Sequence, residues 1–508
     1  MREGEMADAG SMGHVHVAIV GSGFGGLGMA IRLKERGIND FAVLERADDV
    51  GGVWRDNRYP GCACDVQSHL YSFSFAPNPA WTRRFSPQPE IWAYLVRCAD
   101  EFGIRPHIRF RTDVERAEWD ASAARWTLAT SRGVMTADVL VAAPGALSEP
   151  RLPQVPGLET FAGEVFHSAR WDPSAMLAGR RVAVVGTGAS AIQIVPAIQP
   201  VVSRLVLFQR TPPWVLPRHD APLSVRTRRW MDRVPPLRRA VRGSLYGFRE
   251  LFGLPFRHPR LAALPERMAR RHLREQVPDA ALRRILTPSY AIGCKRILLS
   301  DDYYPALSQP NVQVVPTGLA EVRGDAVVGP DGVPHAVDAI IFATGFHVTD
   351  FPFAARIRGA GGRLLSDVWG ASPKAHLGTT VAGFPNLFVL SGPNTGLGHT
   401  SVLLMIEAQV DHVLNALDHM QRNGIAAVAP TVDAQAAWIT EVDRKMEGTV
   451  WTSGGCKSWY LDETGRNSTL WPGSVGSFVR RVTPFRSEEY HLYPGPPSHA
   501  SRAAAARG

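Results

Sequence analysis

The sequence lacks any hydrophobic run close to the roughly 18 apolar residues that a membrane-spanning helix requires, so no transmembrane segment is expected. Cysteine is scarce: the 508 residues include five, and an odd number in so long a chain does not look like a disulfide framework. This usage fits a reducing cytoplasm, which is the predicted location. The first 13 residues are polar and mixed in charge, so they are not expected to form a signal peptide.

Positive charge, in contrast, is plentiful and unevenly distributed. The chain carries a formal net charge of +9, and much of the excess arginine lies between residues 218 and 284, for example at Arg238 and Arg239. We favour solvated helix faces there over an anionic partner or a membrane surface, and we expect no nucleic-acid partner. Apolar residues at 45% and charged residues at 20% are typical of a soluble globular protein, and the length predicts about two to four domains.

A first nucleotide-binding loop follows a short apolar segment. Residues 15–20 predict a buried parallel strand, and the glycines after it are Gly21, Gly23 and Gly26, in the order Gly-Ser-Gly-Phe-Gly-Gly. A helical pattern then runs to Arg36. In the order strand, GxGxxG, helix, the glycines allow a tight turn, close approach to a pyrophosphate and close packing of helix on strand. The pyrophosphate is expected at the positive end of the helix.

The residues after the second strand are candidates to contact the same nucleotide. The strand 41–44 ends at Glu45 and Arg46, where a carboxylate can accept hydrogen bonds from ribose hydroxyls. Residues 51–65 contain Gly-Gly-x-Trp, with Trp54, then Tyr-Pro-Gly and Asp65, and resemble the flavin-side segment of flavoprotein monooxygenases. Cys62 and Cys64 lie in this segment with neither the spacing of a disulfide reductase nor a second pair for zinc. We expect buried free thiols and no metal site.

A second nucleotide-binding loop follows the strand 181–185. It contains Gly186, Thr187, Gly188 and Ser190, with Ala191 at the third glycine position, and a helical pattern continues through residue 198. The next strand, 205–209, ends in Arg210 and Thr211, where a binder of NAD would have an acidic residue. An arginine there suits a 2′-phosphate and favours NADP, although an exposed arginine at a strand end is the alternative.

The rest of the chain predicts a helical insertion and a return to the first domain. The pattern becomes helical and arginine-rich from residue 212 to about 290, and Lys295-Arg296 follows, which composition alone would place on the surface. Strands at 139–145 and from residue 339 end in small-residue turns, which are similar to the Ala-Thr-Gly exit motif of flavoproteins with two dinucleotide-binding domains. A long helix is expected at 400–421, with its N-terminus near the flavin. Trp459 is a candidate for the pocket wall, with packing as the alternative.

Between the two loops, residues 161–172 connect two nucleotide-binding regions and have the pattern FxGxxxHxxxWD. With the loops, this pattern resembles the fingerprint of the type I Baeyer–Villiger monooxygenases, and the resemblance covers about residues 14–475. Every specified position is filled, and the positions are Phe161, Gly163, His167, Trp171 and Asp172.

The resemblance implies an α/β fold with two Rossmann-like dinucleotide-binding domains, for FAD and NADP, and a helical insertion. The implied divisions are a disordered N-terminus (1–13), the FAD-binding domain (14–150 and 345–493), the NADP-binding domain (151–344, with the insertion at about 218–290) and a disordered tail (494–508). The implied reaction inserts one oxygen atom of O2 next to a ketone carbonyl and gives an ester or lactone, through reduction of FAD by NADPH and a C4a-peroxyflavin.

Roles for individual residues follow from the same resemblance. Arg296 and Asp65 are implied as catalytic residues, and Lys295 is expected to contact the 2′-phosphate with Arg210 and Thr211. His167 and Trp171 would couple the two domains. An amine- or sulfide-oxygenating flavin monooxygenase and a non-oxygenating NADPH:flavin oxidoreductase are the alternatives. The oligomeric state does not follow from the sequence.

Overall fold

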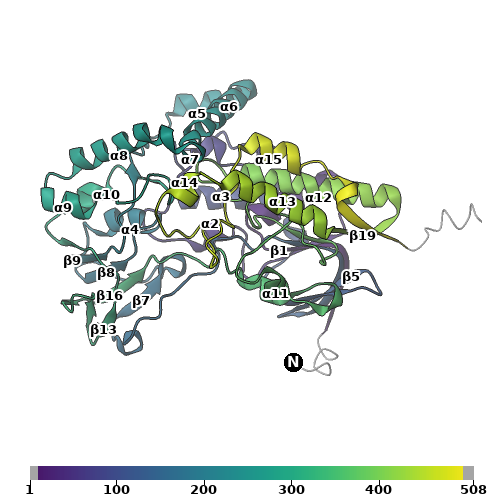
Figure 1. Cartoon of the computed structure of the whole chain (residues 1–508), viewed down its shortest axis with the longest axis horizontal. Helices are drawn as coiled ribbons and strands as arrows, with labels where there is room; N and C mark the ends of the chain where they lie inside the picture. Colours follow the sequence, from purple (N-terminus) through teal and green to yellow (C-terminus); the bar gives the residue numbers. More distant parts are fainter. Residues whose placement is uncertain (1–9, 496–508) are drawn as a thin grey trace, which may run out of the picture.

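The computed structural model describes residues 10–495 and contains two main β-sheets, each covered by helices (Figure 1). The strand order of the first sheet is β17-β4-β5-β6-β1-β2-β3, and β18 also pairs with β6. Its strands are β1 (Ser11–Val20), β2 (Phe41–Leu44), β3 (Ile108–Arg109), β4 (Val114–Asp120), β5 (Arg125–Thr130), β6 (Gly133–Ala142), β17 (Ile357–Arg358) and β18 (Leu387–Val389). β1 pairs in parallel with β2 and β6, as in a dinucleotide-binding domain.

The second sheet is entirely parallel and has the order β12-β9-β8-β16-β7. Its strands are β7 (Glu164–His167), β8 (Arg181–Val185), β9 (Arg204–Phe208), β12 (Val312–Val315) and β16 (Ala339–Phe342). In Figure 1 this sheet lies at the lower left and the first sheet at the right. The predicted strands at 41–44 and 181–185 are confirmed to the residue.

Both faces of the first sheet are buried, which explains why its central strands are apolar without alternation. Val17 and Ile19 of β1 pack against α1 (Phe24–Glu35), α3 (Gln88–Glu101) and α12 (Leu403–Asn423). Ala18, on the opposite face, packs in a cluster that contains Trp126 and Phe384. Parallel strands covered on both sides are expected to be continuously hydrophobic.

The arginine-rich segment forms a group of helices along the top of the molecule in Figure 1. These helices are α5 (Val225–Arg233), α6 (Pro235–Phe252), α7 (Leu254–Arg257), α8 (Ala263–Gln276) and α9 (Ala280–Ile285). Interpreting all of their arginines as solvated is wrong for Arg249, which is buried and donates to the Asp65 carbonyl and the Gln67 side chain. No helix within residues 10–495 is long and apolar enough to cross a membrane.

The predicted disordered ends are partly ordered. Residues 1–9 and 496–508 lie outside the described part of the chain, but the prediction is wrong for residues 11–13, which begin β1, and for Pro494. The backbone of β1 pairs with β6 from Ser11 onward. Pro494 ends β20 (Tyr490–Pro494), which pairs with β19 (Ile425–Pro430). Polar side chains misled the sequence-based prediction because strand pairing is made by backbone groups.

A buried hydrogen-bond network fixes this C-terminal strand. The Nδ1 atom of His412, on α12, lies 2.8 Å from the Val482 carbonyl oxygen, so this nitrogen carries the proton and donates. The Nε2 atom then accepts from the Tyr490 hydroxyl, 2.9 Å away. Burial lowers the pKa of His412 from 6.5 to about 4, which keeps the ring neutral in the folded protein.

We therefore expect the free energy of unfolding to fall as the pH decreases from 6.5 to 4. Over this range the unfolded chain binds a proton at His412, whereas the folded protein does not. This one group contributes a slope of about 1.4 kcal/mol per pH unit in that window and none above it. His412→Gln should be less stable at neutral pH. Its free energy of unfolding, measured by urea denaturation, should change less with pH than that of the wild type. His491→Gln, on the exposed face of β20, is the control. Equal slopes in His412→Gln and the wild type would contradict the assignment.

Candidate active site

The first glycine loop has the geometry of a nucleotide site. Gly21 adopts a φ of +96°, and a Cβ there would lie 2.6 Å from the Ala143 carbonyl oxygen. A Cβ at Gly26 would lie 1.8 Å from the Gly21 carbonyl oxygen, so the start of α1 can approach the turn only without a side chain. At Gly23 the nearest atom would be the Gly52 Cα at 3.7 Å, which places the loop beside the predicted flavin-side segment.

Glu45, at the end of β2, is buried and already bonded to protein groups. One carboxylate oxygen accepts from the backbone N–H and the hydroxyl of Ser22, at 2.9 and 2.6 Å. The other accepts from the Ala47 N–H at 2.9 Å and from Arg55 at 3.1 Å. These four donors match the capacity of a carboxylate, so a ribose hydroxyl could bind only by displacing one of them. Arg46 is paired with Glu149.

The segment 51–65 lies between the two sheets' hydrophobic cores. Trp54 packs against clusters from both, and its indole N–H donates to the Tyr71 hydroxyl at 3.0 Å. Cys62 and Cys64 are buried free thiols, as predicted. Burial raises the pKa of the Cys62 thiol to about 12 and also raises that of Cys64. Neither thiol is a nucleophile at neutral pH, because the reactive form is the thiolate.

Arg296 and Asp65 meet in this region although 231 residues separate them. The Nε and Nη2 atoms of Arg296 donate to one Asp65 carboxylate oxygen, at 3.0 and 2.7 Å. The Nη1 atom donates to the Leu397 carbonyl oxygen at 2.9 Å. The Arg296 and Asp65 side chains keep 22% and 30% of their surface accessible, so the pair is only partly enclosed by protein. The composition-based placement of this arginine on the surface is therefore wrong.

Arg296 and Asp65 keep each other in their charged forms. Burial alone would lower the pKa of Arg296, but the Asp65 carboxylate more than offsets this and raises it. Burial would likewise raise the pKa of the Asp65 carboxyl, whereas Arg296, Arg249 and Arg218 hold it below its usual range. A carboxylate near three guanidinium groups leaves excess positive charge, and such a site favours an anion.

Two residues of this site were not among the predicted site residues. Arg249 reaches the Asp65 backbone from α6, and nothing in the sequence distinguishes it from the 13 other arginines of residues 225–276. Tyr460 is buried beside Arg296. Burial raises the pKa of the Tyr460 hydroxyl to about 12, although the neighbouring arginine acts in the opposite direction. The Ser-Trp-Tyr cluster at 458–460 was the available signal for Tyr460, but aromatic clusters more often only pack.

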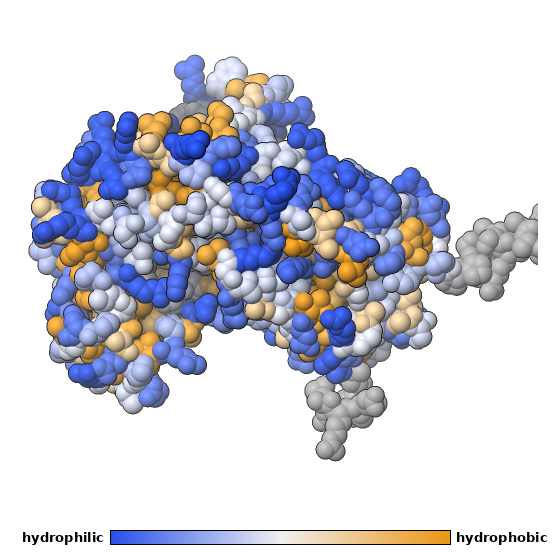
Figure 2. Space-filling model, in the orientation of Figure 1, coloured by the Kyte–Doolittle hydropathy of each residue, from blue (hydrophilic) through white to orange (hydrophobic). Residues whose placement is uncertain are grey.

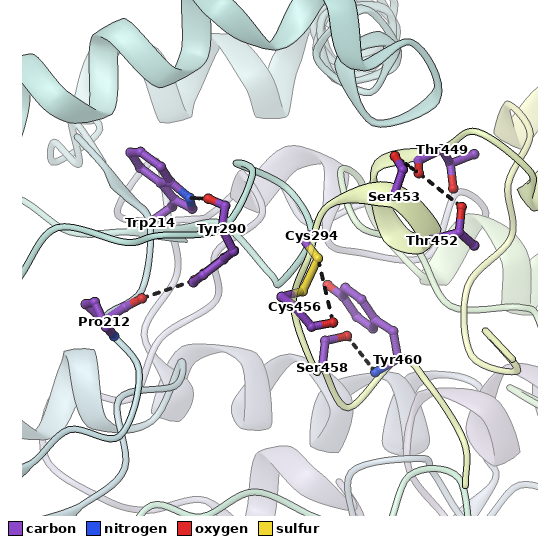
Figure 3. Close-up of a disulfide and its surroundings, with 10 residues drawn as sticks. All are labelled: Pro212, Trp214, Tyr290, Cys294, Thr449, Thr452, Ser453, Cys456, Ser458 and Tyr460. Atoms are coloured by element: carbon purple, nitrogen blue, oxygen red, sulfur yellow. Dashed lines mark hydrogen bonds between the residues drawn. A yellow bond between two sulfur atoms is a disulfide. The ribbon is translucent and has the colours of Figure 1, made fainter. Parts of the chain in front are cut away.

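A disulfide joins the segment before Arg296 to the segment before Tyr460 (Figure 3). It links Cys294 to Cys456, and in the close-up the Tyr460 ring lies alongside it. The prediction that the cysteines form no disulfide is thus wrong for this pair. Their separation of 162 residues gave no indication that the two thiols are neighbours. The bond fixes the position of the arginine-bearing loop relative to the C-terminal segment.

The second glycine loop repeats the first. Gly186 adopts a φ of +115°, and a Cβ there would lie 2.4 Å from the Ala343 carbonyl oxygen. A Cβ at Gly188 would meet no protein atom within 4 Å, which leaves that side of the loop open to a ligand. The Thr187 hydroxyl donates to the Thr211 carbonyl at 2.9 Å, and Ser190 precedes α4 (Ala191–Ile198).

Lys295 and Arg210 lie close together at the edge of this loop. Burial, together with the charge of Arg210, lowers the pKa of Lys295. The Lys295 ammonium lies 5.2 Å from the centre of the Tyr290 ring. Within residues 10–495, neither cation has a carboxylate within 4 Å. Two neighbouring unpaired cations are the arrangement that a phosphate group requires.

The fingerprint segment forms β7, the edge strand of the second sheet, and the turn after it. Gly163 is needed because a Cβ there would lie 2.6 Å from the Phe161 ring. His167 is buried, and its ring packs edge-on against Phe346 beyond the second exit motif. Trp171 packs against Phe166.

The end of the fingerprint and the pocket candidate are exposed. The Asp172 carboxylate accepts from the N–H and hydroxyl of Ser174 and closes a turn. Trp459 is also exposed and lies against Tyr460, with 4.3 Å between ring centres. The structure therefore joins Asp65 to Arg296. It places the segment 51–65 against the first loop at Gly52 and against α4 through the Tyr59 hydroxyl, which donates to Gln193 at 3.1 Å. It leaves Asp172 at the surface.

Comparison with known proteins agrees with this geometry. The sequence model of the family described as "Flavin-binding monooxygenase-like" (FMO-like) matches residues 14–224. A protein from Streptomyces coelicolor named Baeyer-Villiger monooxygenase is 54% identical over 97% of this chain and 96% of its own. The chain belongs to the Baeyer–Villiger monooxygenase family.

Solved structures of this family share the fold. Cyclohexanone monooxygenase from Rhodococcus sp. Phi1, bound to NADP+, is 30% identical with a TM-score of 0.84, over 95% of this chain and 99% of its own. OTEMO, in complex with FAD and NADP, is 27% identical with a TM-score of 0.85, over 94% and 99%. The predicted family, α/β fold, monooxygenase activity and pair of cofactors are therefore confirmed, and nothing favours the heteroatom-oxygenating or non-oxygenating alternatives.

The second loop yields a prediction that separates folding from binding. Gly186→Ala places a Cβ against backbone atoms at a residue in a left-handed conformation. It should therefore lower the melting temperature and weaken the binding of NADPH. Gly188→Ala has room in the protein and should leave the melting temperature unchanged. If this loop holds the pyrophosphate as the sequence predicts, the same change should weaken NADPH binding by about tenfold or more.

Thermal denaturation and NADPH titration measure the two effects, and the flavin content should stay the same in both variants. Gly318→Ala, where a Cβ would also meet nothing within 4 Å, is the control. NADPH affinity of Gly188→Ala equal to that of the wild type would show that the second loop does not hold the nicotinamide cofactor.

Proposed function

We propose that the chain uses NADPH, FAD and O2 to convert a ketone to an ester or lactone, and that Arg296 controls the oxygen transfer. The observation that carries the assignment of Arg296 is its guanidinium, which is held by Asp65 and the Leu397 carbonyl, on a side chain that remains partly accessible. Family membership supports the reaction class, and no nucleic acid is required for it.

The residues present fit both cofactors. The first loop has a cradle at Gly21 and Gly26 that any side chain would fill, beside a segment with Trp54. We assign FAD to it, with Glu45 and Arg46 at the ribose side. We assign NADP to the second loop, with its pyrophosphate at Gly188 and Ser190.

We assign the 2′-phosphate to Arg210, Thr211 and Lys295. Two cations without carboxylate partners among the described residues support this, since a phosphate would supply the missing charge. An NAD site would instead have a carboxylate near the ribose.

When bound, the reduced flavin supplies the electrons that activate O2 for insertion next to a carbonyl. The protein's own contribution is electrostatic. Attack on a ketone carbonyl develops negative charge on oxygen, and a guanidinium that stays protonated and is already oriented stabilises that charge without reorganisation. Asp65 orients Arg296 and balances its charge, while Arg296 itself, with smaller contributions from Arg249 and Arg218, lowers the pKa of Asp65 and keeps it ionised.

We assign a coupling role to the fingerprint. His167 ends the edge strand β7 and contacts Phe346, where the chain leaves the second sheet. Trp171 belongs to the same hydrophobic cluster as Trp54 of the flavin-side segment. Burial lowers the pKa of His167 to about 4, so its ring is neutral at pH 7 and is not a cationic proton donor.

Arg296→Ala should retain bound FAD and lose ester formation. Removing one preorganised donor of this kind costs about 10²–10³-fold in rate. We would measure ester yield from a ketone panel under labelled O2, where the wild type should place one labelled oxygen in each product. The control is Arg323→Ala, on an exposed hairpin strand paired with Glu321. An unchanged ester yield in Arg296→Ala would refute the assignment, and labelled sulfide or amine products with no ester would refute the reaction class.

Arg210→Gln should weaken the binding of NADPH by about tenfold or more and leave the binding of NADH unchanged, because one charge-assisted contact to the 2′-phosphate is lost. Steady-state KM values for the two nucleotides measure this change in preference. Arg204→Gln, an exposed arginine at the opposite end of β9, is the matched control. An unchanged preference would remove Arg210 from the phosphate site.

A further inference from the structure

The helical insertion carries the entire excess positive charge of the protein. Residues 225–276 contain 14 arginines, four acidic residues and no lysine, a net charge of +10, whereas the whole chain carries +9. The rest of the molecule is thus close to neutral. A charge this concentrated needs a reason beyond solubility, because solubility does not require it to lie in one place.

The same helices expose an unusual number of large apolar side chains. Of the 19 exposed large hydrophobic residues within the described part of the chain, eight lie between residues 225 and 268. Six of them define what we call the apolar face, namely Trp230, Phe248, Leu251, Leu261, Leu264 and Met268. Phe248 and Leu251 are 59% and 66% exposed. Isolated exposed leucines need no explanation, but a concentration of this kind marks an interaction surface.

Within α6 and within α8, spacing places the exposed apolar side chains along one side of each helix. On α6, Phe248 lies 11 residues after exposed Leu237, close to three turns of about 3.6 residues, and Leu251 follows one turn later. On α8, Leu264 and Met268 are four residues apart, with exposed Arg267 and Arg271 beside them. Figure 2 shows apolar and strongly polar residues side by side along the top edge, above α5, α6 and α8.

We propose that this face docks on an anionic lipid bilayer surface. Arginines that flank an apolar stripe complement acidic headgroups, while Trp, Phe and Leu side chains enter the boundary of the acyl chains. A symmetric contact with a second copy of the chain would place a +10 surface against itself. Nucleic acid would neutralise the arginines but would give no favourable environment to leucine and methionine.

The position of α6 connects this surface to the site below it. Arg249, between Phe248 and Glu250 on α6, points inward and donates to the Asp65 carbonyl at 3.0 Å. One helix therefore has the bilayer-facing residues on its outer side and a contact of the Arg296–Asp65 pair on its inner side. Apolar compounds dissolved in a bilayer would meet the protein at this helix.

The test is co-sedimentation of the full-length, cofactor-loaded protein with vesicles. We expect binding to phosphatidylcholine vesicles that contain phosphatidylglycerol, a decrease with added salt, and little binding to pure phosphatidylcholine. A triple variant, Phe248→Ser, Leu251→Ser and Leu264→Ser, should bind at least tenfold more weakly. The control replaces three exposed apolar residues elsewhere, Met176→Ser, Val201→Ser and Val333→Ser, and should bind as the wild type does.

A second triple variant, Arg229→Gln, Arg239→Gln and Arg267→Gln, tests the contribution of charge. Its binding to anionic vesicles should depend less on salt concentration than that of the wild type. Bound flavin confirms that each variant is folded. Equal vesicle binding by the triple serine variant and its control would overturn the proposal. So would a dimer without vesicles that the serine variant dissociates, because a second copy would then cover this face. Stronger retention on DNA than on anionic vesicles would also overturn it.

Discussion

The ion pair between Arg296 and Asp65 is the contact on which the organisation of the site depends. Asp65 ends the segment 51–65 of the first sheet's domain, whereas Arg296 precedes β11 (Leu298–Leu299) after the helical insertion. Leu397, which accepts from the same guanidinium, belongs to the returning part of the chain. Three distant segments thus meet at one planar cation. A pair in such surroundings contributes little to stability by itself, but losing either partner would leave an uncompensated charge. The pair therefore holds Arg296 in place and charged, although it adds little to the stability of the fold.

The two glycine loops pack against their neighbouring strands in the same way. In each, the first glycine of the loop lies against the carbonyl of the alanine that directly follows a neighbouring strand, Ala143 after β6 in one and Ala343 after β16 in the other. The chain leaves each sheet at that alanine. The exit turns are therefore part of the nucleotide loops' own packing. Pro144 can replace the threonine found in the second exit turn, since the contact is made by the residue before it.

The sequence predicted the parts that follow local rules. Strand-glycine-helix order located both loops, and the strands 41–44 and 181–185 were predicted to the residue because continuous apolar runs have sharp ends. The assignment of Arg296 and Asp65 to one catalytic site came from family resemblance, because spacing cannot bring together residues 231 positions apart. The position of Arg249 and the bond between Cys294 and Cys456 were missed, since both depend on how the insertion folds back. Residues 11–13 look like a polar terminus, yet backbone pairing makes them a strand.

The disulfide has a consequence for what happens when the chain is cut. It encloses residues 294–456, a loop that includes the exit turn at 343–345, Leu397 and α12. A protease that cleaves anywhere inside this loop leaves two fragments that remain covalently joined. A nicked molecule would therefore migrate as one band on a gel until a reductant separates it. Arg296, two residues from Cys294, would stay tethered to the segment that carries Tyr460 even after the intervening backbone is broken.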